Sequence, residues 1–243
     1  MLRILGRYLI EVVERYELCP WARSARLGGE VATGVLWGAP AMDEWVATAA
    51  ELLARPGARV VMVVAPELAI TPAGLRALRS RVAARLPYAG IADFHPQATL
   101  DLTTPARLVP FLRRAPDPLL QLVPLSLLNA VRGPPPTIDR ARQALLLGGL
   151  SAPPRADAAT RIAAANHATA LRHASEIEAV LDVIAADRAA AYARAGISAG
   201  DAGDAADDVR VDVAGAVDVA DVASAVDIAD VASAVDVASA ASG

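Results

Sequence analysis

The stretch "ARVVMVVA", residues 58–65, decides the fold of this chain. It is a continuous apolar run, and it is short enough to be a buried strand. A strand with apolar side chains on both faces needs a packed layer on each side, because neither face can be left to water. We therefore predict that this run is the central strand of a sheet that is covered on both faces.

The segments around this run alternate between helical and strand patterns. Helices are predicted over 2–18, 39–57 and 71–87, and further strands over 30–37, 88–97 and 118–123. Strands that alternate with helices of this length are typical of an α/β fold, here a layered α+β sandwich. We expect a mixed sheet of about four strands with helices packed on it, and parallel pairing where a helix crosses over.

Composition divides the chain into three regions. Residues 1–150 are expected to form the α/β core domain, and residues 151–199 a helical segment that packs on this core. The clearest helical pattern of the second region spans 156–195, and a glycine follows it at 196. Residues 200–243 form an acidic, low-complexity tail.

The tail is built on a nonapeptide repeat. The unit "VDVADVASA", residues 217–225, returns as "VDIADVASA" at 226–234. Neither a helix nor a strand with this period gives a consistent apolar face. A calcium-binding nonapeptide roll needs glycines that these two units lack. With its many aspartates, the tail is therefore expected to be disordered.

Composition also restricts the class of protein. Hydrophobic residues make up 55% of the chain, which is ample for a core. The chain has no lysine and its basic side chains are arginines, which we interpret as the imprint of a GC-rich genome before any arginine chemistry. The single cysteine excludes an internal disulfide and a multi-cysteine metal site, and it fits a reducing cytoplasm.

Neither a membrane nor a nucleic acid is expected as a partner. Charged residues interrupt any signal-peptide core at the N-terminus, and no stretch approaches the roughly 18 apolar residues of a membrane helix. The mildly basic body shows no basic stripe with interleaved aromatic residues. Phosphate-binding, dinucleotide-binding, zinc-protease and serine-elbow motifs are absent from the sequence. We assign no metal ligands, and the sequence leaves any cofactor unidentified.

The only cysteine, Cys19, lies in "YELCPWARSAR", residues 16–26. Pro20 disfavours helical geometry at Cys19, which leaves two alternatives. If Cys19 ends the first helix, the helix dipole keeps its thiol protonated. If Pro20 instead begins a new helix, Cys19 is its N-cap, and the helix end together with Arg23 favours the thiolate. The second alternative makes Cys19 a candidate nucleophile.

A second candidate is His95, in the strand pattern "IADFHPQ". The strand period places Ile91, Asp93 and His95 on one face, and Ala92 and Phe94 on the other. Asp93 is therefore placed to orient the imidazole, as a carboxylate does in a catalytic site. The alternative is a solvent-facing histidine at a strand end. Cys19, His95 and Asp93 are the catalytic candidates.

Three further residues are candidates for binding a ligand. Gln121 interrupts the apolar run "LLQLV", and a buried glutamine must be hydrogen-bonded, so it is expected to point at a polar group. Arg114, adjacent to Arg113, has the charge to bind an anionic substrate, although adjacent arginines are usually solvated. Arg23 completes this set through its place beside Cys19.

"ELCPWAR", "ADFHPQ" and "RRAPDPLLQLV", in this order and spacing, resemble an uncharacterised bacterial family, domain of unknown function 1415. The resemblance covers about residues 1–175. Residues 19–22 match the family's cysteine-proline-aromatic-alanine motif, and 94–96 its phenylalanine-histidine-proline motif. Gln121 and Pro124 depart from it, since many members have histidine and arginine there. The resemblance implies no established reaction, and the departures imply an altered or lost activity if those positions support one.

Two functions are compatible with these residues. In the first, the chain is a thiol- and histidine-dependent enzyme or a small-ligand-binding domain that uses Cys19 and His95. In the second, it is a non-catalytic binding or scaffolding domain, whose partner is an unidentified small molecule or protein. The discriminating observation is geometric: the first requires Cys19 and His95 to line one pocket.

Overall fold

We analysed a computed structural model that describes residues 1–132, 158–198 and 200. Its helices are α1 (Leu2–Tyr8), the π-helix η1 (Leu9–Glu14), α2 (Ala22–Leu27), α3 (Met42–Leu53), α4 (Pro72–Arg85), α5 (Pro105–Leu112), α6 (Leu125–Arg132) and α8 (Ala158–Ala195). Its strands are β1 (Val31–Val35), β2 (Val60–Val64), β3 (Ala89–Phe94) and β4 (Leu119–Pro124). The nonapeptide repeat lies outside the described residues.

The four strands form one mixed sheet in the order β1-β2-β4-β3. Strands β1 and β2 are parallel, and α3 joins them, as the crossover rule requires. Strand β4 is inserted between β2 and β3 and runs antiparallel to both. In this register Gln121 lies at the centre of the sheet, opposite Met62 on one side and Ala92 on the other. The predicted α/β fold with a mixed four-stranded sheet is confirmed.

Strand β2 carries the run that the sequence singled out. All five of its residues are buried. Val61 and Val63 belong to one hydrophobic cluster, whereas Met62 and Val64 belong to the other. The sheet is therefore covered on both faces, as the continuous apolar run predicts.

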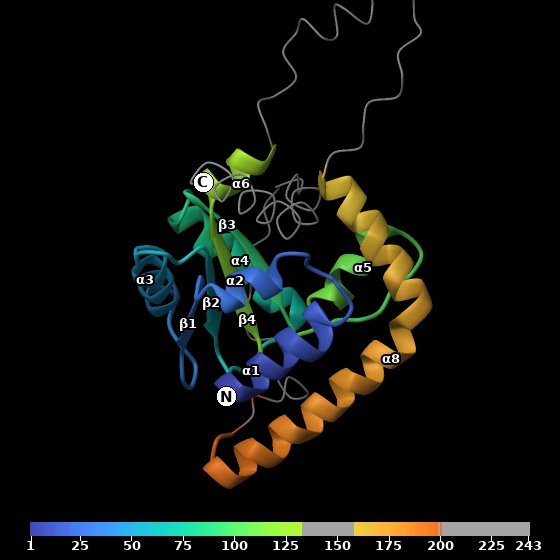
Figure 1. The fold of residues 1–243 in the computed structure, drawn as a ribbon. Helices are drawn as coiled ribbons and strands as arrows, with labels where there is room; N and C mark the ends of the chain where they lie inside the picture. The colour runs from blue at the N-terminus through green and yellow to red at the C-terminus, as the bar shows by residue number, and fades with distance from the viewer. Residues whose placement is uncertain (133–157, 199, 201–243) are drawn as a thin grey trace, which may run out of the picture.

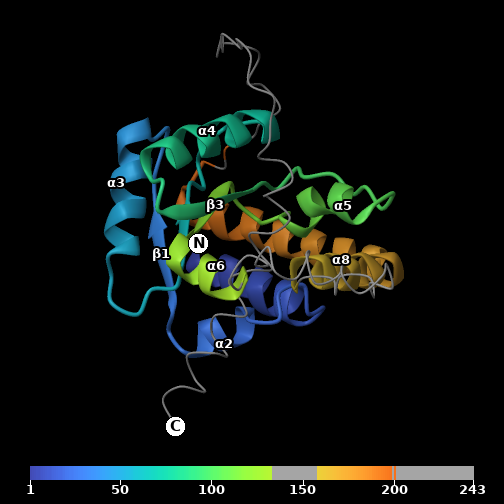
Figure 2. The ribbon, with the colours of Figure 1, turned by 90° about the horizontal axis from the view of Figure 1, so that it is seen from above.

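Helices cover the two faces of the sheet unequally (Figures 1 and 2). Helices α3 and α4 cover one face and contribute Trp45, Leu52, Leu75 and Val82 to its core. The other face lies under α1, η1, α5 and the long helix α8. Helix α8 adds Ile177 to this second core, so it shares a hydrophobic core with the sheet.

Two helices begin with the same local signal. Thr71 accepts a hydrogen bond from the Gly74 amide, and Pro72 is the first residue of α4. Thr104 caps α5 in the same way, and Pro105 follows it. The sequence analysis predicted a helix over 71–87, which contains α4, but did not predict α5.

The N-terminal helix differs from the single helix predicted over 2–18. It continues from α1 into the π-helical segment η1, and the helical geometry ends before Glu17, whose φ is 53°. A positive φ is unusual for glutamate, because its Cβ crowds the backbone there. Within the part of the chain that the structure describes, no helix is long and apolar enough to cross a membrane.

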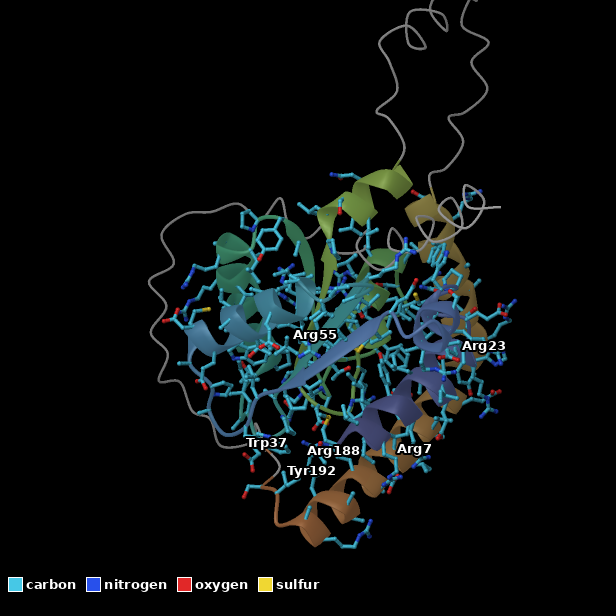
Figure 3. All side chains as sticks on the ribbon, turned by 60° about the vertical axis from the view of Figure 1, so that its left-hand side comes forward. Arg7, Arg23, Trp37, Arg55, Arg188 and Tyr192 are labelled. Atoms are coloured by element: carbon cyan, nitrogen blue, oxygen red, sulfur yellow. The ribbon has the colours of Figure 1, made fainter. Side chains whose placement is uncertain are left out.

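A buried carboxylate holds α8 to the sheet. Asp117, 2% exposed, precedes β4 between two prolines. It accepts hydrogen bonds from Arg188 Nε at 2.5 Å and from the Tyr192 hydroxyl at 2.7 Å, both on α8. Arg188 also donates to the Pro66 carbonyl at 3.1 Å, which ties the same helix to the end of β2. Figure 3 shows Arg188 and Tyr192 together at this end of the molecule.

Replacing Asp117 by Asn is expected to lower the free energy of unfolding by about 3–5 kcal/mol, because it leaves the Arg188 charge buried without its counter-ion. Urea unfolding followed by circular dichroism measures this. The control is Glu51→Gln, which breaks an exposed pair with Arg55 and should cost no more than about 0.5 kcal/mol. A loss of less than 1 kcal/mol for Asp117→Asn, measured on the same scale, would contradict a structural role for this pair.

Candidate functional site

Two hollows lie on either side of α5. Four of the six residues that the sequence analysis selected line them, two in each hollow. One is a mostly apolar cavity over the sheet face under α1 and α8, and Cys19 and Gln121 line it. The other is a cleft between α4 and α5, and His95 and Asp93 line it. Val109 of α5 contributes to the wall of both.

Cys19 lies in a turn just ahead of α2. Its carbonyl accepts a hydrogen bond from the Ala22 amide at 3.2 Å, and α2 begins at Ala22. A new helix therefore follows Pro20, as in the second alternative, but it begins at Ala22 with Trp21 as its N-cap, so Cys19 is not the N-cap that this alternative predicted. The electrostatic consequence expected from that alternative does not follow, because Arg23 is exposed at the outer surface (Figure 3).

Burial determines the protonation state of the Cys19 thiol. It raises the pKa above the usual value, because the charged thiolate loses its hydration. Backbone N–H groups of Trp21 and Ala22 hydrogen-bond to the sulfur and act in the opposite direction, but they do not outweigh the burial. Cys19 is therefore protonated at neutral pH, and its geometry gives no activated nucleophile.

Both ring nitrogens of His95 are engaged by the backbone. The amide of Gln97 donates to Nδ1 at 3.0 Å, so the proton of the neutral ring is on Nε2. Nε2 lies 2.8 Å from the Ile70 carbonyl and donates to it. Burial lowers the pKa of His95, although the Ile70 bond and Asp93 oppose this shift. His95 is thus a neutral residue that joins the end of β3 to the loop before α4.

Asp93 does not orient the imidazole as the sequence analysis predicted. Its carboxylate pairs with Arg79 of α4, with Oδ1 at 3.2 Å from Nε. The faces of the strand are nevertheless as predicted, since Ile91 packs toward α4 and Phe94 toward the opposite core. The Asp93–Arg79 contact is an ion pair whose angle does not make a hydrogen bond, so the buried Nε has no hydrogen-bond partner among the described residues.

The cleft beside His95 is lined by arginine. It encloses about 410 Å³, and four arginines and one aspartate line it: Arg76, Arg79, Arg107, Arg113 and Asp93. Two of these arginines are buried, Arg79 at 8% and Arg113 at 4% exposure. Arg113 of the predicted anion-binding pair is therefore in the cleft, whereas Arg76, Arg79 and Arg107 were not predicted.

Arg107 is held at the rim of the cleft by Asp101. Oδ2 of Asp101 lies 3.1 Å from Arg107, while Oδ1 accepts hydrogen bonds from the amide and the hydroxyl of Thr103. These contacts, led by the Thr103 hydroxyl, lower the pKa of Asp101 to about 2. Arg76 is exposed and has no ion pair with any described residue. Its guanidinium is therefore available to a ligand.

Arg114 and Gln121 lie outside the arginine-lined cleft. Arg114 donates to the Pro96 carbonyl at 3.1 Å and lies 3.6 Å from Glu178 of α8, so it fastens α8 to the end of β3. Gln121 faces the apolar cavity from the centre of the sheet. Among the described residues, no group of three or more histidine, cysteine or acidic side chains is placed to hold a metal ion.

Comparisons with protein-family models, with curated proteins and with solved structures each gave no match for this chain. The functional argument therefore rests on the two hollows themselves. Cys19 and His95 line different hollows, and no hydrogen bond joins them.

Alkylation of Cys19 by iodoacetamide is expected to follow a pH midpoint above the usual value of about 8.5, because burial raises the pKa of the thiol. His95→Ala should leave this midpoint unchanged, since His95 lies in the other hollow. Mass spectrometry of the single cysteine gives the rate at each pH, and the urea-unfolded chain is the control with an ordinary midpoint. A midpoint below 8, or one that moves in His95→Ala, would contradict this assignment.

His95 is expected to make the protein less stable in mild acid. Its pKa is lowered in the folded state, so the unfolded chain binds the proton more readily as the pH falls below about 6.5. The free energy of unfolding should therefore decline below that pH, by at most about 1.4 kcal/mol per pH unit from this group.

His95→Gln should remove this part of the decline, which urea unfolding between pH 5 and 8 will measure. The control variant His173→Gln, on α8, retains His95 and should retain the decline. Equal pH dependence in the wild type and His95→Gln is the result that rules out this linkage.

Proposed function

We propose that this chain binds a small anionic ligand, with phosphate or carboxylate groups, in the arginine-lined cleft between α4 and α5. The observation that carries the proposal is the convergence of four arginines on one cleft whose lining contains a single carboxylate. The volume of about 410 Å³ lies within the range of small-molecule sites.

The charges of the cleft support an anion as the ligand. Burying a guanidinium is costly unless an anion compensates it, and among the described residues Asp93 supplies the one carboxylate paired with the buried Arg79. Arg76 lies one helical turn from Arg79 on α4, so both side chains face the cleft. Guanidinium groups donate in a planar fork that matches phosphate and carboxylate oxygens.

The same geometry argues against a Cys19–His95 enzyme. A general base must reach the group that it activates, and these two residues line separate hollows. His95 positions the cleft through its backbone hydrogen bonds, which join β3 to the loop before α4. Of the two functions compatible with the sequence, ligand binding without this dyad has the better support.

We also propose that the chain belongs to the bacterial family that its three motifs resemble, and that it acts in the cytoplasm. The lone, reduced cysteine supports a reducing compartment. Both proposals rest on the sequence, and the binding proposal does not depend on either.

Isothermal titration with inorganic phosphate and with citrate tests the binding proposal and distinguishes the two anion chemistries. Arg76→Gln should weaken binding of the better ligand about tenfold, because it removes a charged hydrogen-bond donor. Raising the salt concentration should weaken binding further.

Arg81→Gln is the matched control. Arg81 is on the same helix and is equally exposed, but it does not line the cleft. It should therefore change the affinity less than twofold, although it removes the same charge. The proposal fails if neither anion binds at 10 mM, or if Arg76→Gln and Arg81→Gln weaken binding equally.

A further inference from the structure

We infer that the cavity over the sheet is a second binding site, which takes a small uncharged molecule with an apolar body and one hydrogen-bonding group. This inference is independent of the arginine-lined cleft. It rests on the shape and lining of the cavity, on an unpaired amide at its floor, and on the π-helix in its wall.

The cavity is large enough for a small organic molecule. Its volume of about 90 Å³ is several times the roughly 10–15 Å³ that one water needs on the same measure. Most of the lining is aliphatic or aromatic, with Leu5, Leu9, Met62 and Phe94 among its members. Water gains few hydrogen bonds on such surfaces, so an apolar ligand gains free energy by displacing it.

Gln121 places an amide against this apolar space. It is the one polar residue of β4, and it points to the same side of the sheet as its register partners Met62 and Ala92. Its side chain forms no hydrogen bond with any residue that the structure describes. An amide in this position offers one donor and one acceptor to a ligand.

An ion pair, whose net charge is zero, lies at one end of the cavity. Glu30 Oε1 lies 3.4 Å from Arg59 Nη1, and both residues belong to the lining. The charges of this pair offset each other, so this end favours an uncharged ligand over an ion. Glu30 Oε2 is buried without a hydrogen-bond partner among the described residues, and it can accept a bond from a ligand donor.

The wall opposite the sheet has an unusual backbone. Leu9 and Val13, both in η1, line the cavity from a π-helical turn, a rare geometry that is frequent at functional sites. The chain then passes through Glu17 at φ 53° before Leu18 and Cys19 join the lining. Such a conformation costs free energy, and residues of this kind cluster at binding sites.

Isobutyramide is a suitable probe, because its branched chain suits the cavity and its amide complements that of Gln121. The readout is intrinsic, since Cys19 is the only cysteine and lines the cavity. Saturating isobutyramide should slow alkylation of Cys19 by N-ethylmaleimide at least fivefold. It should also shift the Gln121 side-chain amide resonances in a ¹H–¹⁵N spectrum.

Gln121→Leu separates the amide contribution from the apolar one. It should weaken isobutyramide about tenfold, because the paired hydrogen bonds are lost. Protection of Cys19 by cyclopentane should persist or increase in the same variant, which shows that the fold and the cavity are intact. Arg76→Gln should leave both probes unaffected, so failure of the anion site is distinguishable from failure of this one.

Two results would overturn the inference. One is the absence of both protection and resonance shifts in the wild type with 50 mM isobutyramide. The other is an unchanged preference for isobutyramide over cyclopentane in Gln121→Leu, which would show that the amide does not select the ligand.

Discussion

The carboxylate of Asp117 is the interaction on which the rest of this structure depends. It is buried between two prolines at the start of β4, and it holds both Arg188 and Tyr192 of α8. Burial, reinforced by the Asp117 bond, raises the pKa of Tyr192, so its phenol remains a donor to the carboxylate. Because α8 is long, fixing it at this end also determines where its earlier turns lie. Those turns carry Ile162 and Asn166, which line the cavity. Exposed contacts, such as that of Arg3 with Asp187, also hold this helix. Because water screens them, they influence where the helix lies more than they stabilise the fold.

The two faces of the sheet are packed differently, and the apolar cavity lies on the face that carries α8. On the closed face, α3 and α4 pack directly on the strands, and a Cβ on Gly34 would come within 3 Å of Thr48 and Leu52. On the open face, α1, η1, α5 and α8 share one hydrophobic core with the sheet, and the cavity lies among them. The π-helical turn of η1 and the amide of Gln121 lie where this packing is incomplete. A cavity of this kind is retained at a cost to stability, and an amide in its wall that hydrogen-bonds to no described residue points to a ligand.

The sequence predicted the sheet well and the site poorly, for different physical reasons. The apolar run of β2 and the Thr71–Pro72 cap of α4 are local signals, and local signals locate strands and helices. Helix α5 was missed although Thr104–Pro105 gives the same signal, because eight residues show little periodicity.

The candidate site depended on which residues meet across the sheet, and the order of residues along the chain does not contain that information. Phe94 and His95 are adjacent in sequence, yet one lines the apolar cavity and the other the arginine cleft. Arg79 was overlooked because an arginine on a helix is usually solvated, and its burial is decided by Asp93 on the following strand.

Helix α5 makes the two hollows interdependent. Val109 lines both, and the helix is fixed at its end by a hydrogen bond from the buried Tyr8 hydroxyl to the Leu112 carbonyl. The next residue, Arg113, lines the cleft, while its guanidinium lies 6.0 Å from the ring of Phe94, which lines the cavity. A ligand that displaced α5 from either side would therefore alter the walls of both sites. Thermodynamic linkage requires any such effect to be reciprocal: an anion that changes the affinity of the cavity must have its own affinity changed by the same factor when the cavity is filled. The position of this short helix, which begins at Pro105 and contains Pro110, thus determines whether the two sites act separately or together.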